Sequence, residues 1–196
     1  MKEYYDTRAP EYDDWWLGRG LFAGRERPGW EDELGDLAVL IASLPPTRTL
    51  DVACGTGFLT QHLHGDVVGV DQSARMLEIA ARRLPHATFV QGDALELPFP
   101  NDVFGRVFTT YFYCHLEEPD RLRFVAEARR VADELVVIGS HAEPGEEKER
   151  WEERVLEDGS RWQVFKRVFD PAELAAELGG EVLHAGRWFV VVRAPL

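Results

Sequence analysis

The chain has 196 residues, of which 45% are hydrophobic and 29% are charged, ordinary values that exclude a disordered chain and a fibrous repeat. Its 35 acidic residues outnumber the 22 basic ones, which gives a formal charge of -13, and a field of that sign repels nucleic-acid backbones and anionic lipid surfaces. We therefore expect neither nucleic acid nor a membrane as a partner.

The N-terminus and the cysteines predict the cellular location. The first residues, MKEYYDTRAPEYDDWW, are acidic and aromatic, unlike a secretory signal, and no apolar run reaches the roughly 18 residues that span a bilayer. Cys54 and Cys114 lack the spacing of metal ligands, and such a pair is not a disulfide framework. We expect a single cytoplasmic domain over residues 1–196, a monomer or homodimer, without a metal.

Helices and strands alternate along most of the chain after an aromatic leader, residues 1–30. Residues 31–43 place Leu34, Leu37, Leu40 and Ile41 at helical spacing, and two prolines stop the pattern. Further helices are expected at residues 58–64, 73–84 and 120–131, and strands at 48–53, 67–70, 87–90, 103–110 and 135–138. The strands are nearly continuous apolar runs, as in a parallel sheet covered on both faces. The order predicts a doubly wound α/β fold.

The pattern changes after residue 140. Residues 143–154 are dense in charge, and the segment 154–169 flanks an Asp158-Gly159 turn, a strong hairpin signal. A helix at 171–178 is expected to stop at Gly179, and the strands at 181–185 and 187–194 are too close together for a parallel crossover. We expect an inserted hairpin within residues 143–169, and an antiparallel end of the sheet within 170–196.

A glycine turn follows the first expected strand. Gly55 and Gly57 let the backbone approach a ligand closely, although such a turn is as often purely structural. Asp71 ends the second strand and Asp93 follows the third, so a parallel sheet brings both carboxylates to one edge. We expect Asp71 to accept hydrogen bonds from ribose hydroxyls and Asp93 to accept one from an adenine amino group. The alternative role for Asp71 is to cap the following helix, but Ser73 can provide that cap instead.

The same turn discriminates between two kinds of nucleotide. A nicotinamide dinucleotide site requires a third glycine, and Thr60 stands at that position. Asp51 directly precedes the turn, which suits a bound ammonium better than a pyrophosphate. The turn therefore favours a nucleoside that carries an amino acid, and a nicotinamide oxidoreductase is the less favoured alternative.

The segments LDVACGTGFLT, VVGVDQSARMLEIAARR, FVQGDALELPF and FGRVFTTYFYCHL lie in this order within residues 48–139. They resemble the successive motifs of class I S-adenosylmethionine-dependent methyltransferases, and the leader YYDTRAPEYDDW is similar to the segment that folds over the cofactor in small members. The resemblance implies a Rossmann-like, mostly parallel seven-stranded sheet. Two positions depart from the pattern: Ala53 replaces a glycine, and Gly105 stands where an aspartate is usual.

Carried over position by position, the resemblance implies S-adenosylmethionine as cofactor and S-adenosylhomocysteine as product. The turn would surround the methionine portion, Gln72 and Met76 would flank ribose and adenine, and Thr110 and Tyr111 would lie at the methionine end. The complete set expected to bind the cofactor is Tyr12, Asp51, Ala53, Gly55, Thr56, Gly57, Asp71, Gln72, Met76, Gly92, Asp93, Ala94, Thr110 and Tyr111.

Transfer of a methyl group from a sulfonium requires mainly that the acceptor be held close and aligned. For an acceptor that must lose a proton, His115 is the first candidate for general base and His141 the second; a packing role is the alternative for both. We expect a small-molecule acceptor, with the attacking atom (O, N or C) left open. A protein or nucleic-acid acceptor and a catalytically silent cofactor-binding protein are the alternatives.

Aromatic residues outside the motifs are expected to form the acceptor pocket. They come from the leader and from the hairpin, and they predict a largely apolar or planar acceptor. The residues are Tyr4, Tyr5, Tyr12, Trp15, Trp16, Trp151, Trp162 and Phe165.

Overall fold

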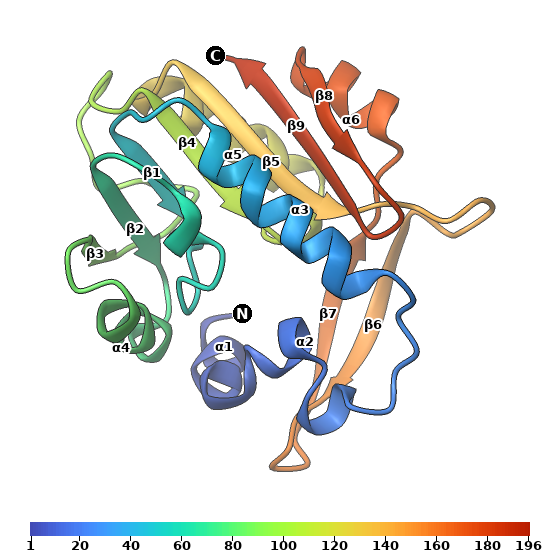
Figure 1. Ribbon diagram of the computed structural model, residues 1–196. Coiled ribbons are helices and arrows are strands. Elements are labelled where there is room, and N and C mark those ends of the chain that lie inside the picture. The colour runs from blue at the N-terminus through green and yellow to red at the C-terminus, as the bar shows by residue number, and fades with distance from the viewer.

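The computed structural model describes residues 1–196, which form a seven-stranded sheet in the order β3-β2-β1-β4-β5-β9-β8 (Figure 1). Strands β1 to β5 pair in parallel, and β9 is antiparallel to both of its neighbours. The mostly parallel, doubly wound sheet is thus confirmed. The strands are β1 (Thr49–Val52), β2 (Val67–Asp71), β3 (Thr88–Gln91), β4 (Arg106–Thr110), β5 (Glu134–Ser140), β8 (Glu181–Ala185) and β9 (Phe189–Pro195).

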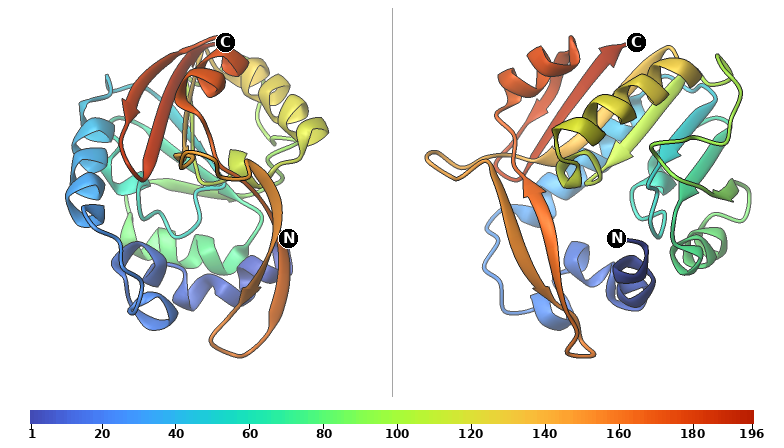
Figure 2. Two further views of the ribbon diagram at one scale, coloured as in Figure 1. Left: turned by 90° about the vertical axis from the view of Figure 1, so that its right-hand side faces the viewer. Right: turned by 180° about the vertical axis from the view of Figure 1, so that it is seen from behind.

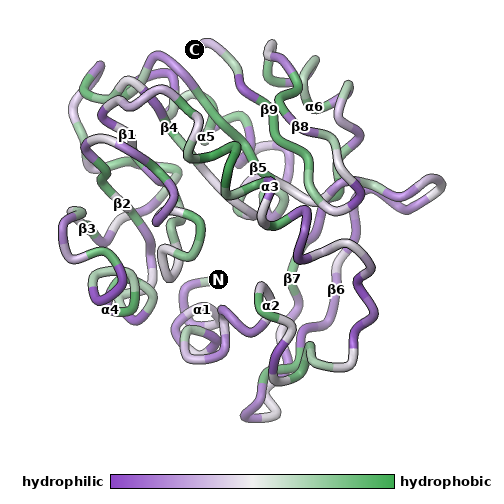
Figure 3. The backbone as a smooth tube through the Cα atoms, viewed as in Figure 1, coloured by the Kyte–Doolittle hydropathy of each residue, from purple (hydrophilic) through white to green (hydrophobic).

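Helices α3 (Trp30–Ser43) and α5 (Glu118–Val131) cover opposite faces of the sheet, as the front and back views show (Figures 1 and 2). Each buries one apolar stripe, with Leu37 of α3 and Phe124 of α5 fully enclosed, and each such side chain contributes roughly 1.5–3 kcal/mol. Between them, β5 and β9 are hydrophobic along most of their length (Figure 3). No helix combines the length and apolarity that a membrane crossing requires.

Side-chain caps fix the starts of two helices, α4 and α6. Helix α4 (Ala74–Arg83) begins after Ser73, whose Oγ accepts a hydrogen bond from the Met76 amide at 3.2 Å, the cap expected from the sequence. Helix α6 (Pro171–Leu178) begins after Asp170, which accepts from the amides of Ala172 and Glu173, and it ends at Gly179 in the left-handed conformation. These caps orient both helices against the sheet edges.

The helix expected at residues 58–64 is wrong. The structure has only a single 3₁₀ turn there, η3 (Thr60–His62), because Leu63 is already extended and Gly57 and Gly65 adopt positive φ angles on either side. The extended backbone at Leu63 therefore ends the turn before an α-helix can form.

Three segments that are distant in sequence gather at the carboxyl edge of the parallel strands (Figures 1 and 2). The first is the leader, with α1 (Lys2–Arg8), η1 (Ala9–Glu11), α2 (Asp14–Leu17) and η2 (Gly20–Phe22). The second is η4 (Tyr113–His115), and the third is the separate hairpin of β6 (Glu149–Val155) and β7 (Arg161–Arg167). Tyr4 of the leader is buried against Leu156 and Val164 of the hairpin, so the leader and the hairpin enclose space over this edge.

Candidate functional site

A cavity of about 280 Å³ lies at the carboxyl edge of β1, β2, β3 and β4. Eleven of the fourteen residues expected to bind a cofactor line it, as does His115. Three of the fourteen do not: Asp51, Thr56 and Gly57. Sequence reasoning missed six lining residues. Four of them lie within the quoted motif segments, directly beside predicted site residues or close to them, and Met1 and Asp120 lie outside the segments: Met1, Val70, Leu95, Phe112, Leu116 and Asp120.

Asp71 ties the glycine turn to the start of α4. Its Oδ2 accepts a hydrogen bond from the Gly55 amide at 2.9 Å, and its Oδ1 accepts one from the Ser73 amide at 2.8 Å. Burial raises the pKa of the carboxyl group, while these backbone bonds act in the opposite direction. The side chain therefore fixes the backbone of the turn and still lines the cavity.

Two residues of the cavity wall have a left-handed backbone although they are not glycine. Ala53 after β1 has φ 57 and Tyr111 after β4 has φ 53, a conformation that costs roughly 1–2 kcal/mol for such residues. Strain of this kind is concentrated at ligand sites. The conformation of Ala53 explains why a glycine is usual at this position of the motif, and its small side chain lets the turn form without one.

Asp51 lies beneath the turn and does not line the cavity. Its Oδ2 accepts a hydrogen bond from Thr60 Oγ1 at 2.5 Å, and its Oδ1 is buried without a partner. Burial raises the pKa of this carboxyl group to about 7. Gly57 packs against α4, where an added Cβ would lie 3.4 Å from the Cβ of Ala80. Both residues support the turn from behind.

The leader is fastened to the turn by polar contacts. Thr56 Oγ1 donates to Asp13 Oδ1 at 2.5 Å, and Arg83 of α4 donates to the Thr56 carbonyl oxygen at 2.7 Å and to Asp13. The ring of Tyr12 lies close over Gly55, where an added Cβ would be 3.5 Å from Cε1. Thr56 thus serves the site by holding the leader over the cavity.

A second, larger cavity of about 850 Å³ adjoins the first. The two share four lining residues, Tyr5, Tyr12, Tyr111 and His115, which we call the shared wall. The hairpin contributes one face of its strands to the larger cavity, because side chains alternate between faces along a strand. The hairpin residues concerned are Arg150, Glu152, Arg154, Val164, Lys166 and Val168.

The aromatic acceptor pocket expected from the sequence is only partly present. Tyr4, Tyr5, Tyr12 and Trp15 line the larger cavity. Trp151 and Phe165 pair with each other across the hairpin, and Trp151 is 59% exposed. Of the remaining two, Trp16 is buried in the core and Trp162 packs against Tyr4. The hairpin therefore turns charged side chains toward the cavity, and the expectation that its aromatic residues form the acceptor pocket is wrong.

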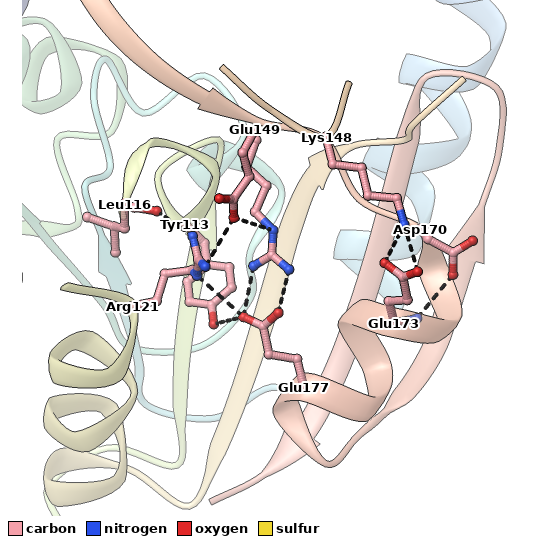
Figure 4. Close-up of polar contacts among 9 residues, drawn as sticks. Tyr113, Leu116, Arg121, Lys148, Glu149, Asp170, Glu173 and Glu177 are labelled. Carbon is pink, nitrogen blue, oxygen red and sulfur yellow. Dashed lines mark hydrogen bonds and ion pairs between the residues drawn. The ribbon is translucent and has the colours of Figure 1, made fainter. Parts of the chain in front are cut away.

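A polar network anchors the base of the hairpin to the core (Figure 4). Arg121 of α5 pairs with Glu149 of β6 at 3.1 Å, and Arg167 of β7 pairs with Glu177 of α6 at 2.6 Å. Glu177 also accepts a hydrogen bond from Tyr113 Oη at 2.6 Å, which connects the network to η4. The charged face of the hairpin is thereby held in position beside His115.

The two candidate histidines differ in position. His115 belongs to the shared wall, and its Nδ1 lies 2.6 Å from the Phe165 carbonyl oxygen, an acceptor, so Nδ1 carries the proton and Nε2 the lone pair. Burial, reinforced by the positive charge of Lys166, lowers its pKa to about 3. His141 lines only the larger cavity and contacts the Gly186 carbonyl oxygen. A role as general base stays a prediction for either residue.

Comparison with known proteins identifies the class. A parallel sheet with an acid-lined cavity at the ends of β1 and β2 defines a nucleoside-binding α/β protein. The family model described as a methyltransferase domain matches residues 49–134. The demethylmenaquinone methyltransferase of Thermotoga maritima is 34% identical over 132 residues, which cover 65% of this chain and 54% of the relative. Residues 49–134 thus match a methyltransferase domain, and the chain is similar to class I S-adenosylmethionine-dependent methyltransferases.

Two further comparisons show how far the likeness extends. A sugar N,N-dimethyltransferase of Streptomyces venezuelae, named for dTDP-3-amino-3,4,6-trideoxy-alpha-D-glucopyranose, is 40% identical over 95 residues, 46% of this chain and 37% of the relative. The solved DhpI–SAH complex has a TM-score of 0.73 at 25% identity and covers 97% of this chain and 92% of that one. The chain spans about half the length of the demethylmenaquinone methyltransferases that it matches.

Proposed function

We propose that this protein transfers a methyl group from S-adenosylmethionine, bound in the smaller cavity, to a small molecule bound in the larger one. The observation that carries the proposal is the shared wall: two cavities of about 280 and 850 Å³ meet at the same four residues. Donor and acceptor held on either side of that wall are close and aligned, which is the main requirement of the reaction. Residues 1–196 then act as one domain.

The residues of the smaller cavity fit an amino-acid-bearing nucleoside. Asp71 and Asp93 supply acceptors for ribose hydroxyls and an adenine amino group, and Met76 supplies an apolar surface for the base. The glycine turn leaves room for the methionine portion. When bound, S-adenosylmethionine supplies a methyl group made electrophilic by its sulfonium. The chain contributes by holding both molecules and by keeping water out with the tyrosines of the shared wall.

The protonation states of the shared wall limit its part in the chemistry. His115 is neutral at pH 7 because its pKa is lowered to about 3, and burial raises the pKa of Tyr5, Tyr12 and Tyr111 well above the ordinary value. None of these groups exchanges a proton readily near neutrality. We infer that Nε2 of His115 accepts a hydrogen bond from the acceptor and orients it, which makes His115 the first residue to test and His141 the second.

Binding of S-adenosylhomocysteine, measured by calorimetry, tests the proposal. We expect tight binding and no binding of NADH. Asp71→Asn should weaken the binding of S-adenosylhomocysteine at least about tenfold, because charge-assisted hydrogen bonds are lost. Asp93→Ala should weaken it less and leave thermal stability unchanged, since Asp93 is exposed. Asp36→Ala, an exposed residue of α3, is the control.

Binding of NADH in place of the nucleoside would contradict the assignment. A screen of small acceptors for release of S-adenosylhomocysteine then separates an enzyme from a silent cofactor-binding protein. Binding without turnover of any acceptor would favour the silent protein.

A further inference from the structure

The larger cavity has the opposite charge balance to the rest of the chain. Its lining includes seven Lys or Arg side chains and four Glu side chains, whereas the whole chain has 22 basic and 35 acidic residues. The two carboxylates without an ion-pair partner, Glu26 and Glu143, are exposed. The unpaired carboxylates therefore lie at the rim together with the exposed Arg25 and Arg187, and the remaining lining has five cations and two paired carboxylates, Glu146 and Glu152.

Five of the seven cations have no acidic partner, and two of these, Lys166 and Arg8, lie against the shared wall. Lys166 is only 9% exposed, and its Nζ donates to Ser140 Oγ at 2.8 Å. Arg8 donates to Tyr4 Oη at 2.7 Å. No carboxylate oxygen lies within 4.0 Å of either cation, whereas most other Arg and Lys side chains of the hairpin are paired. An uncompensated buried charge costs several kcal/mol. The fold itself supplies no counter-charge for these two cations.

Both cations stand against the shared wall. The Arg8 guanidinium lies 5.0 Å from the ring centre of Tyr12, and Lys166 Nζ lies 5.2 Å from that of Tyr111. Contacts with aromatic faces compensate a buried cation only in part. Arg154 adds a third donor, because its Nε is buried without a partner while its other end pairs with Glu152. The unsatisfied donors thus border the wall where the acceptor must sit.

We propose that the acceptor is a small acid, whose carboxylate or phosphate-type oxyanion is bound by Lys166 and Arg8, with Arg154 as a further donor, beside the shared wall. This inference rests on the proposed function and names the substrate class of the same site. Burial lowers the pKa of Lys166, as expected of an ammonium group that lacks its counter-ion, and a bound anion restores that pKa. An oxyanion gains charge-assisted hydrogen bonds from all three cations.

The test uses protein saturated with S-adenosylhomocysteine and titrated with sodium phosphate or sodium acetate at constant ionic strength. Tryptophan fluorescence reports binding, since Trp15, Trp30 and Trp188 line the cavity. We expect saturable binding of at least one anion, and the stronger of the two identifies the kind of oxyanion. Lys166→Met should lower the affinity for that anion at least about tenfold, and Lys166→Arg should retain most of the affinity.

Arg161→Met is the matched control. Arg161 lies on the same strand but is 66% exposed and paired with Glu153, so its replacement should leave anion binding unchanged. Lys166→Met should be about as stable as the wild type, because it removes a buried charge without leaving a charged partner behind and loses only the hydrogen bond to Ser140. Equal anion binding in the Lys166→Met variant, or no binding of either anion to the wild type, would overturn the inference.

Two readouts keep this inference separate from the proposed function. Binding of S-adenosylhomocysteine is measured first on every variant, and its absence in the wild type contradicts the proposed function itself. Acceptors are then supplied as matched pairs, each acid beside its neutral amide. Faster turnover of the acids supports the inference, whereas turnover confined to the amides contradicts the inference and leaves the methyltransferase assignment intact.

Discussion

Arg83→Met should weaken cofactor binding without altering any residue of the cavity wall. Arg83 joins α4 to the leader by donating to the Thr56 carbonyl oxygen at 2.7 Å, to Thr56 Oγ1 at 3.1 Å and to Asp13. The substitution keeps an unbranched apolar stem but removes the guanidinium group and with it all three bonds. The leader is then held to the turn mainly by the direct contact between Thr56 and Asp13 at 2.5 Å.

The magnitude follows from the exposure of the pair. Hydrogen bonds to charged groups contribute about 1.5–3 kcal/mol net, but the side chains of Arg83 and Asp13 are 24% and 22% exposed, which screens part of that energy. A loss of roughly 1–2 kcal/mol is expected, equivalent to about 5- to 30-fold in affinity. The affinity falls because the closed leader, with Tyr12 over Gly55, is the conformation that binds the nucleoside.

Calorimetry with S-adenosylhomocysteine measures the loss, and hydrogen exchange over residues 2–17 measures opening of the leader. Arg82→Met is the control, since Arg82 is the next residue of α4, exposed to solvent and outside every contact that fastens the leader. The reasoning is refuted if Arg83→Met binds as the wild type does and exchanges no faster in the leader.

Two further predictions concern buried titrating groups. His115→Ala should lower turnover severalfold and keep the affinity for S-adenosylhomocysteine within about twofold. The wild-type rate should show no imidazole titration between pH 5 and 8, because the pKa of His115 is lowered to about 3. An unchanged rate in the variant would show that His115 has no part in the reaction. For Asp51, a folded pKa raised to about 7 means that the stabilisation of the protonated form is complete below about pH 4 and lost as the pH rises to about 7. Urea unfolding of Asp51→Asn should therefore give a flatter dependence of stability on pH over this range, and a profile parallel to the wild type would contradict the assignment.

Sequence periodicity predicted the sheet well because its signal is local. Long apolar runs such as β5 are typical of a sheet covered on both faces, as in parallel α/β proteins, and the acids that end β2 and begin the loop after β3 then share one edge. The environment of Asp51, in contrast, could not be predicted from the local sequence, because it depends on the path of the backbone after the turn. Its place before the turn suggested contact with a ligand, but the following backbone passes over it and leaves Thr60 as its hydrogen-bond partner.

The acceptor side was predicted less well, because a hairpin buries whichever face its neighbours cover. Trp151 and Phe165 were expected to line the acceptor pocket, yet they lie opposite each other in register and away from the larger cavity. The alternation of Arg150, Glu152 and Arg154 was the available signal, since charges at every second position mark one continuous face. Only the packing of Tyr4 against the hairpin shows which face is turned inward.

The charge of -13 and a cation-lined acceptor cavity are compatible because they act over different distances. At physiological ionic strength a charge is screened beyond roughly 8 Å. A nucleic acid needs an extended basic surface, which this acidic chain does not offer, whereas a small oxyanion responds to the few donors that surround it. Arg8, Arg154 and Lys166 are distant in sequence and were part of an unremarkable scatter of basic residues, but folding brings all three close enough to His115 to lower its pKa. The composition therefore argues against polyanions as substrates, and the proposed small acid is compatible with it because only the few cations of the larger cavity need to act on it.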